Sequence, residues 1–64
     1  MSTRYHYEGK VVRVEQWPDG WRVAIRTRTG LLHTHWPLFS TEELAQAKLD
    51  AWAVKKGLEP INDH

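Results

Sequence analysis

The chain has 64 residues and no cysteine, and its nine basic and eight acidic residues give a formal net charge of +1. This length predicts one small domain over residues 1–64, and the lack of cysteine excludes a disulfide framework and thiolate metal sites. The N-terminus lacks the apolar run of a signal peptide, and no segment approaches membrane-spanning length. We therefore expect a cytoplasmic protein without a membrane partner.

Four tryptophans are an unusual number for so short a chain. A chain of this size buries only about 60% of its unfolded surface, and each large ring can bury roughly 150–250 Å², so a few rings compensate for a small core. We expect Trp17, Trp21, Trp36 and Trp52 to lie mostly in the core or at its rim. Alternatively, one or two of these tryptophan side chains are exposed and stack on a base or a partner.

The first twenty residues predict a strand and a turn. Residues 5–17 favour an extended strand that could be interrupted at Gly9. Residues 17–20, Trp-Pro-Asp-Gly, are typical of a type I turn, because proline presets φ and glycine accepts a positive φ. A second strand is therefore expected to follow at Trp21.

A period of two divides this second strand into an apolar side and a cationic side. The apolar side carries Trp21, Val23, Ile25 and Thr27, and the cationic side carries Arg22, Ala24, Arg26 and Arg28. Successive strand residues point to opposite faces of a sheet, so the pattern predicts one dry face and one cationic face. A cationic sheet face is a candidate footprint for phosphate.

A third strand is expected from Leu31 to about Trp36, after a connection that holds Gly30 in a left-handed conformation. The strand should end at Pro37, which has no N–H to donate to a neighbouring strand. With a period of two, His33 and His35 would share one face of this strand.

Two registers remain open for the first hairpin. A loop with an even number of residues would place Val12 and Val14 on the apolar side of the second strand. A three-residue Pro-Asp-Gly loop would instead place Arg13 and Glu15 there, because a one-residue slip exchanges the faces. The hydrophobic pattern favours the even loop.

The sequence after residue 39 predicts a helix. Ser40 and Glu43 fit a capping box, and Phe39 and Leu44 occupy the positions of a hydrophobic staple. Gly57 is expected to close the helix in the left-handed conformation. The residues that share one stripe and should lie across the sheet are Leu44, Ala45, Leu49 and Trp52.

The order strand, strand, strand, helix predicts an α+β fold, in which a three-stranded antiparallel meander packs on one C-terminal helix. The expected ordered core spans about residues 5–58, with a loose tail from Ile61. One helix covers only one face of the sheet. The other face must meet solvent, a partner or a second copy of the chain, so a homodimer is one possible state.

Two stretches resemble a known kind of DNA-binding domain. They are residues 17–26, Trp-Pro-Asp-Gly-Trp-Arg-Val-Ala-Ile-Arg, and residues 36–45, Trp-Pro-Leu-Phe-Ser-Thr-Glu-Glu-Leu-Ala. In these two segments and in the order of its elements, the chain resembles the plant ethylene-response-factor DNA-binding domain. It is also similar to the arm-binding N-terminal domain of phage-type integrases. The resemblance spans most of residues 10–54 and implies a sheet that lies in the major groove. The DNA contacts that the resemblance implies are Arg13, Trp21, Arg22, Arg26 and Arg28.

The predicted function is binding of nucleic acid, DNA in preference to RNA, through the open face of the sheet. Arginine contacts phosphates and reads guanine, and a small sheet fits the major groove. The candidate contacts are Arg13, Trp21, Arg22, Arg26, Arg28, His33 and His35. A protein-interaction or self-association module using the same face is the alternative, because arginine and aromatic residues also dominate interface hot spots. In a third interpretation, the face has no partner and is only solvated, and Glu15 pairs with a cross-strand arginine.

No metal, other cofactor or enzymatic activity is expected. His33 and His35 could begin a metal site, but zinc takes three or four protein ligands, and the chain has no cysteine to supply them. Ser40 is better explained as a helix cap than as a nucleophile. The sequence has no glycine-rich phosphate loop, and one sheet with one helix does not easily enclose a pocket.

Overall fold

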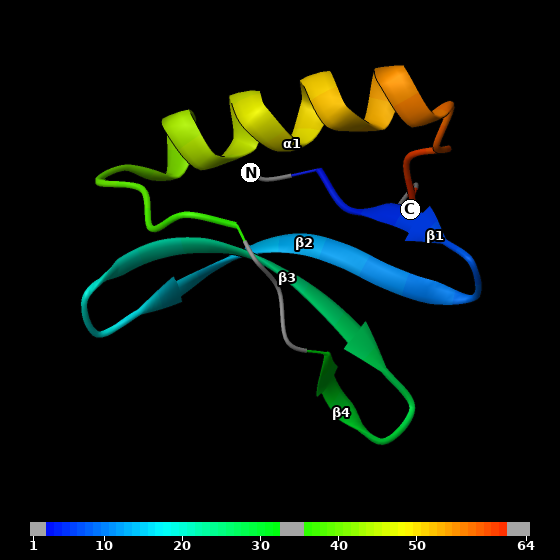
Figure 1. Cartoon of the computed structure of the whole chain (residues 1–64), viewed down its shortest axis with the longest axis horizontal. Coiled ribbons are helices and arrows are strands. Elements are labelled where there is room, and N and C mark those ends of the chain that lie inside the picture. Colours follow the sequence, from blue (N-terminus) through cyan, green and yellow to red (C-terminus); the bar gives the residue numbers. More distant parts are fainter. Residues whose placement is uncertain (1–2, 33–35, 62–64) are drawn as a thin grey trace.

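The computed structural model describes residues 3–32 and 36–61. Its elements are β1 (Tyr5–Tyr7), β2 (Lys10–Trp17), β3 (Gly20–Thr27), β4 (Gly30–Leu32) and α1 (Glu42–Lys56). The strands form one antiparallel sheet in the order β1-β2-β3-β4, and α1 lies across one face of it (Figure 1). The predicted α+β class, an antiparallel meander packed on one C-terminal helix, is confirmed.

The stretch predicted as the first strand folds into two strands. Glu8 and Gly9 join β1 to β2 with φ values of 49° and 79°. Positive φ at both central residues is the geometry of a tight two-residue hairpin. The interruption expected at Gly9 is therefore a reversal of the chain, and it pairs Tyr5 with Val12.

The β2–β3 hairpin adopts the even-loop register. Trp17 pairs with Gly20, so the loop consists of the two residues between them. Val14 then lies opposite Val23, as the hydrophobic pattern favours. A slip of one residue would turn Arg13 toward α1, where its charge would lose water.

The β3–β4 hairpin repeats this geometry. Thr27 pairs with Gly30 across another two-residue loop, and Gly30 has the expected positive φ, at 139°. β4 ends at Leu32 and Trp36 lies outside any strand, so the predicted third strand is too long at its C-terminal end. Residues 33–35 lie outside the described residues.

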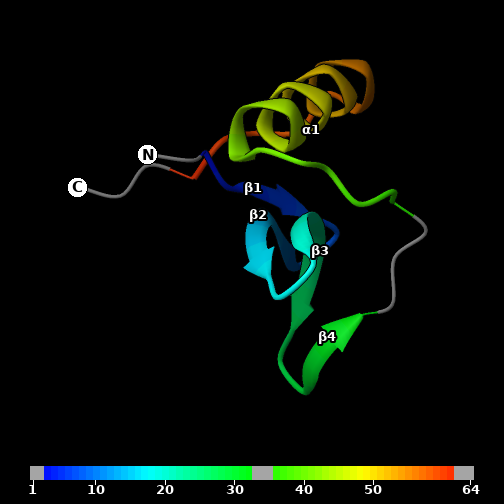
Figure 2. The ribbon, with the colours of Figure 1, turned by 90° about the vertical axis from the view of Figure 1, so that its left-hand side faces the viewer.

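The segment before the helix returns to the other end of β3. Phe39 and Trp21 exchange two backbone hydrogen bonds, at 2.8 and 2.9 Å. Phe39 thereby pairs with the N-terminal part of β3, whereas β4 pairs with its C-terminal part. β4 is the strand farthest from α1 (Figure 2). This return explains why the strand predicted to run to Trp36 is shorter than expected.

Helix α1 begins one residue later than predicted. Thr41 is the N-cap, with extended backbone angles (φ −136°, ψ 157°), and its hydroxyl accepts a hydrogen bond from the Leu44 N–H at 3.2 Å. The capping box predicted from Ser40 and Glu43 is therefore wrong by one position, because threonine offers the same acceptor as serine. Leu44, predicted to face the sheet, is 53% exposed.

The C-terminal end of α1 follows the prediction. Gly57 adopts the left-handed conformation, with φ 70° and ψ 33°. The Leu58 N–H then donates to the Ala53 carbonyl at 2.9 Å, which satisfies a carbonyl that the helix leaves unpaired.

The core lies between α1 and the face of the sheet beneath it. Its buried residues are Val12, Val14 and Val23 from the strands and Ala45, Leu49 and Ala53 from the helix. Trp52 closes the rim through edge-on contacts with Tyr7 and Trp36, at ring-centroid distances of 5.1 and 5.7 Å. Trp21, Trp36 and Trp52 all pack against this core, as predicted.

The chain beyond α1 returns to the edge of β1. The His6 N–H donates to the Glu59 carbonyl at 3.1 Å, and the Ile61 N–H donates to the Arg4 carbonyl at 2.8 Å. Pairing therefore extends to Ile61, past the predicted boundary near residue 58, because it covers backbone groups that β1 would otherwise expose. Residues 62–64 lie outside the described residues. No helix in the described ranges is long and apolar enough to cross a bilayer.

Candidate nucleic-acid interface

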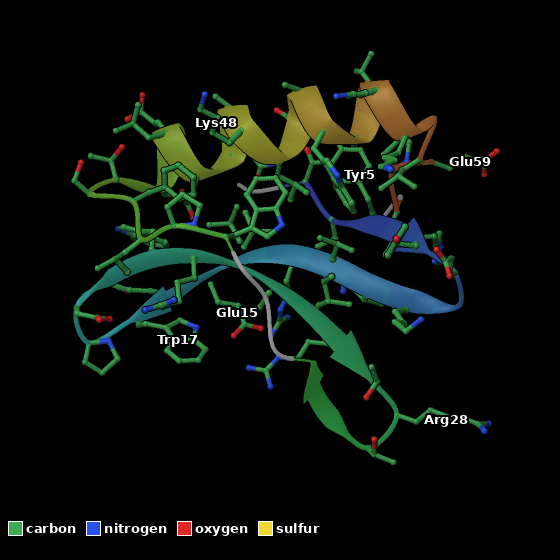
Figure 3. The ribbon with its side chains drawn as sticks, viewed as in Figure 1. Tyr5, Glu15, Trp17, Arg28, Lys48 and Glu59 are labelled. Atoms are coloured by element: carbon green, nitrogen blue, oxygen red, sulfur yellow. The ribbon has the colours of Figure 1, made fainter. Side chains whose placement is uncertain are left out.

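The face of the sheet opposite α1 carries arginine, glutamate and tryptophan side chains. Cross-strand pairing places Arg13 opposite Ala24 and Glu15 opposite Arg22, and residues paired in this way share a face. Figure 3 shows Glu15 and Trp17 on the side of the sheet away from α1. We call this surface the open face and define it by Arg13, Glu15, Trp17, Arg22, Ala24 and Arg26. The predicted separation of an apolar and a cationic side is confirmed in β2 and β3.

Glu15 lies between two arginines at the centre of the open face. Arg26 binds its carboxylate through Nε and Nη2, with both N–O distances at 2.6 Å. Arg13 Nε donates to Oε2 of the same carboxylate at 3.0 Å. The Glu15 side chain is 11% exposed, whereas those of Arg13 and Arg26 are 43% and 42% exposed. The carboxylate is thus the buried centre of the cluster, and the guanidinium groups remain accessible.

These contacts fix the charge state of the cluster. The pKa of Glu15 is lowered from 4.5 to about 2, chiefly because Arg26 hydrogen-bonds to the carboxylate, while burial opposes the shift. The same hydrogen bond raises the pKa of Arg26. At neutral pH the cluster therefore holds two positive charges and one negative charge, and the predicted pairing of Glu15 with a cross-strand arginine is confirmed.

Ala24 shows that these side chains are packed onto the sheet. It is buried, although α1 covers the opposite face. Its pair with Arg13 lies between the pair Glu15–Arg22 and the pair Val11–Arg26, so the Glu15–Arg26 contact crosses over it. The ion pair of Glu15 and Arg26 therefore spans a buried residue of the sheet.

A second group lies beside the β2–β3 turn. The guanidinium carbon of Arg22 is 5.3 Å from the centroid of the Trp17 ring, which is a cation–π contact. Arg22 Nη2 is 3.8 Å from Asp19 Oδ2, a long ion pair between side chains that are 33% and 61% exposed, so this pair contributes little. Arg22 Nε is buried and has no hydrogen-bond partner among the described residues. The tryptophan ring is therefore the main contact that orients Arg22.

Trp17 is a member of this surface that the sequence did not predict. Trp17 was expected in the core or at its rim, but it lies on the open face beside Arg22 (Figure 3). The signal was present, because the period of two that puts Arg13 and Glu15 on one side also includes Trp17. The pairing of Glu15 with a cross-strand arginine was predicted, but its second partner, Arg13 on the same strand, was not.

Two other predicted contacts, Trp21 and Arg28, do not join the open face. Trp21 packs against the core on the side of α1, as its place on the apolar side of the strand requires. Arg28 lies in the exposed loop between β3 and β4, where the alternation of the strand has ended (Figure 3). His33 and His35 lie outside the described residues.

Within residues 3–32 and 36–61, no three His, Asp or Glu side chains are grouped so that they could hold a metal ion. The site is a surface of charged and aromatic side chains on two rigid strands. A comparison with protein families, curated proteins and solved structures found no match. The likeness to the plant ethylene-response-factor domain and to the integrase arm-binding domain therefore stays a prediction.

Proposed function

We propose that this chain is a small cytoplasmic module that binds duplex DNA through the open face. The observation that supports the proposal best is the position of Arg13, Arg22 and Arg26 on the one face of the sheet that α1 leaves free. Accessible guanidinium groups on rigid strands are suited to phosphates and to the edges of bases. No cofactor is needed for such a function.

The shape of the sheet favours duplex DNA over duplex RNA. The major groove of B-form DNA is about 12 Å wide and admits a two-stranded ribbon. β2 and β3 are the two long strands of the sheet, with eight residues each, and β1 and β4 flank them over only three residues each. The major groove of A-form RNA is too deep and narrow for side chains to read. Because α1 lies on the opposite side of the sheet, the helix does not stand between the open face and a ligand (Figure 1).

The charge of the chain predicts weak binding that depends steeply on salt. The net charge is only +1, so attraction to a polyanion comes from the local excess of arginine on the open face. If three arginines each displace about one counterion, affinity should fall roughly 40-fold between 50 and 200 mM salt.

The test is a titration of labelled duplex DNA at these two salt concentrations. The double variant Arg22→Ala, Arg26→Ala should lower affinity at low salt about tenfold or more and should flatten the salt dependence. A matched control, Lys48→Ala with Lys55→Ala, removes two charges from exposed positions of α1. It should bind nearly as the wild type does. Absence of binding at low salt, or equal losses in both double variants, would rule out this function.

A protein partner is the second candidate, and the composition of the open face favours it in one respect. Trp17 and Arg22 are the residue types that dominate interface hot spots, and they lie in contact. For self-association, this candidate predicts a dimer mass in analytical ultracentrifugation that drops to the monomer mass in the Arg26→Glu variant.

A further inference from the structure

The carboxylate of Glu15 is unexpected on a surface that meets DNA. It cancels one of the positive charges of the open face and would weaken the attraction to phosphates. A phosphate group has oxygens that accept hydrogen bonds from many directions, so phosphate binding does not require an oriented arginine. A base edge is planar, and its bidentate recognition requires a guanidinium group held in one plane. Glu15 thus weakens contacts of the arginines with phosphates and assists the contact of an oriented arginine with a base edge.

The hydrogen bonds that the Arg26 side chain makes within the described residues leave one edge of its guanidinium group unused. Glu15 takes the edge formed by Nε and Nη2. The edge formed by Nη1 and the second N–H of Nη2 points away from the carboxylate, since the five N–H donors of arginine lie in one plane. The available edge presents two adjacent donors, which match the adjacent acceptors N7 and O6 of guanine.

The carboxylate is itself held in place. It lies in the middle of β2, it is mostly buried, and Arg13 binds it from the same strand. The contact also passes over the buried Ala24, which supports the two side chains from below. Arg26 is therefore oriented before any ligand arrives, and the entropy lost on binding is smaller.

We propose that Glu15 is a positioning residue that holds Arg26 with its outer edge directed at a guanine base. The inference rests on the proposed function, because it names the base that the open face reads. The inference assigns base reading to Arg26, because Glu15 holds its guanidinium group through two hydrogen bonds.

The test compares two variants that change the charge equally. Glu15→Gln removes the carboxylate that holds Arg26. Asp19→Asn removes a carboxylate at the rim of the same face, beside Arg22, and leaves the Glu15 cluster intact. Charge alone predicts the same effect for both variants, whereas positioning predicts an effect of Glu15→Gln only.

The probes are two duplexes. The first is the sequence that the wild-type protein enriches from a random pool, and the second replaces each guanine in it by 7-deazaguanine, which lacks the N7 acceptor. Wild type and Asp19→Asn should bind the substituted duplex about tenfold more weakly. Glu15→Gln should bind both duplexes equally, and it should bind unselected DNA at least as tightly as the wild type, because it has gained net positive charge.

The outcomes separate the inference from the function on which it rests. If the wild type binds no duplex at low salt, the proposed function fails. If the wild type binds but enriches no sequence containing guanine, or if Glu15→Gln keeps the preference for N7, the inference alone is overturned. Circular dichroism checks that the variants are folded. If Glu15→Gln does not fold, Glu15→Asp replaces it. The shorter side chain keeps the charge but shifts the carboxylate that holds Arg26, so this variant should retain the salt dependence and lose the preference for N7.

Discussion

The two faces of the sheet follow the same alternation but are stabilised in different ways. Beneath α1, Val12, Val23 and Leu49 are fully buried, and their burial contributes through the hydrophobic effect, which has no preferred direction. On the open face, Glu15 and Arg26 form a forked ion pair with fixed geometry. The layer under α1 is stabilised without directional contacts, whereas the open face gains order from hydrogen bonds and keeps its charges accessible.

The largest effect is expected from truncation in the apolar layer. Leu49→Ala should lower the free energy of unfolding by about 3–4 kcal/mol, because it leaves a cavity between α1 and the sheet. Urea denaturation measures the loss. Leu44→Ala is the matched control on the exposed side of the same helix and should cost less than about 0.5 kcal/mol. Equal losses would mean that the helix is rotated from its described position.

The next largest loss of stability is expected at a glycine of the β2–β3 hairpin. Gly20 and Gly30 both have a positive φ, at 147° and 139°. A Cβ on Gly20 would lie 2.8 Å from the Phe39 carbonyl oxygen, whereas a Cβ on Gly30 would meet nothing within 4 Å. Gly20→Ala should therefore cost about 2–3 kcal/mol, and Gly30→Ala only about 1 kcal/mol for its backbone conformation. Thermal denaturation compares the two, and a smaller loss at Gly20 would contradict the contact with Phe39.

A smaller effect tests the open face through pH. The pKa of Glu15 lies near 2 in the folded chain, below its ordinary 4.5. As pH falls through this window, the unfolded chain takes up the proton first, so the stabilisation is present above pH 4.5 and is lost toward pH 2. Glu15→Gln should lower stability at neutral pH by about 1–2 kcal/mol, because solvent screens the half-exposed arginines. The difference from wild type, measured by urea denaturation, should vanish near pH 2; a constant difference would contradict the ion pair.

The smallest effect concerns a polar link on the helix side. The Tyr5 hydroxyl donates to Asp50 Oδ1 at 2.6 Å, and this bond is the main cause that raises the pKa of Tyr5 from 10.0 to about 12. Tyr5→Phe should cost about 1 kcal/mol below pH 10. The unfolded chain loses its tyrosine proton first, so the advantage of the wild type should decline as pH rises from 10 toward 12. Denaturation at neutral and at alkaline pH measures this decline, and an advantage that persists would exclude the hydrogen bond.

Local signals in the sequence predicted the elements better than their ends. The alternation in Trp21–Thr27 and the left-handed Gly57 were both predictable, because each depends on a few neighbouring residues. Ser40 and Thr41 offer the same kind of cap, and local pattern does not distinguish them. The hydrogen bonds between Phe39 and Trp21 fix the path by which the chain enters α1, so a contact distant in sequence helps to decide the cap.

The apolar side and the cationic side of the sheet follow from the sequence alone, because alternation is a property of the extended backbone. Which groups meet on the cationic side depends on how the strands pair. The two-residue loop after Trp17 sets the register, and that register brings Arg26 to Glu15 and Arg22 to Trp17. Which residues of two strands lie opposite each other depends on the length of the loop between them and on packing against the helix, and the residues of a single strand specify neither.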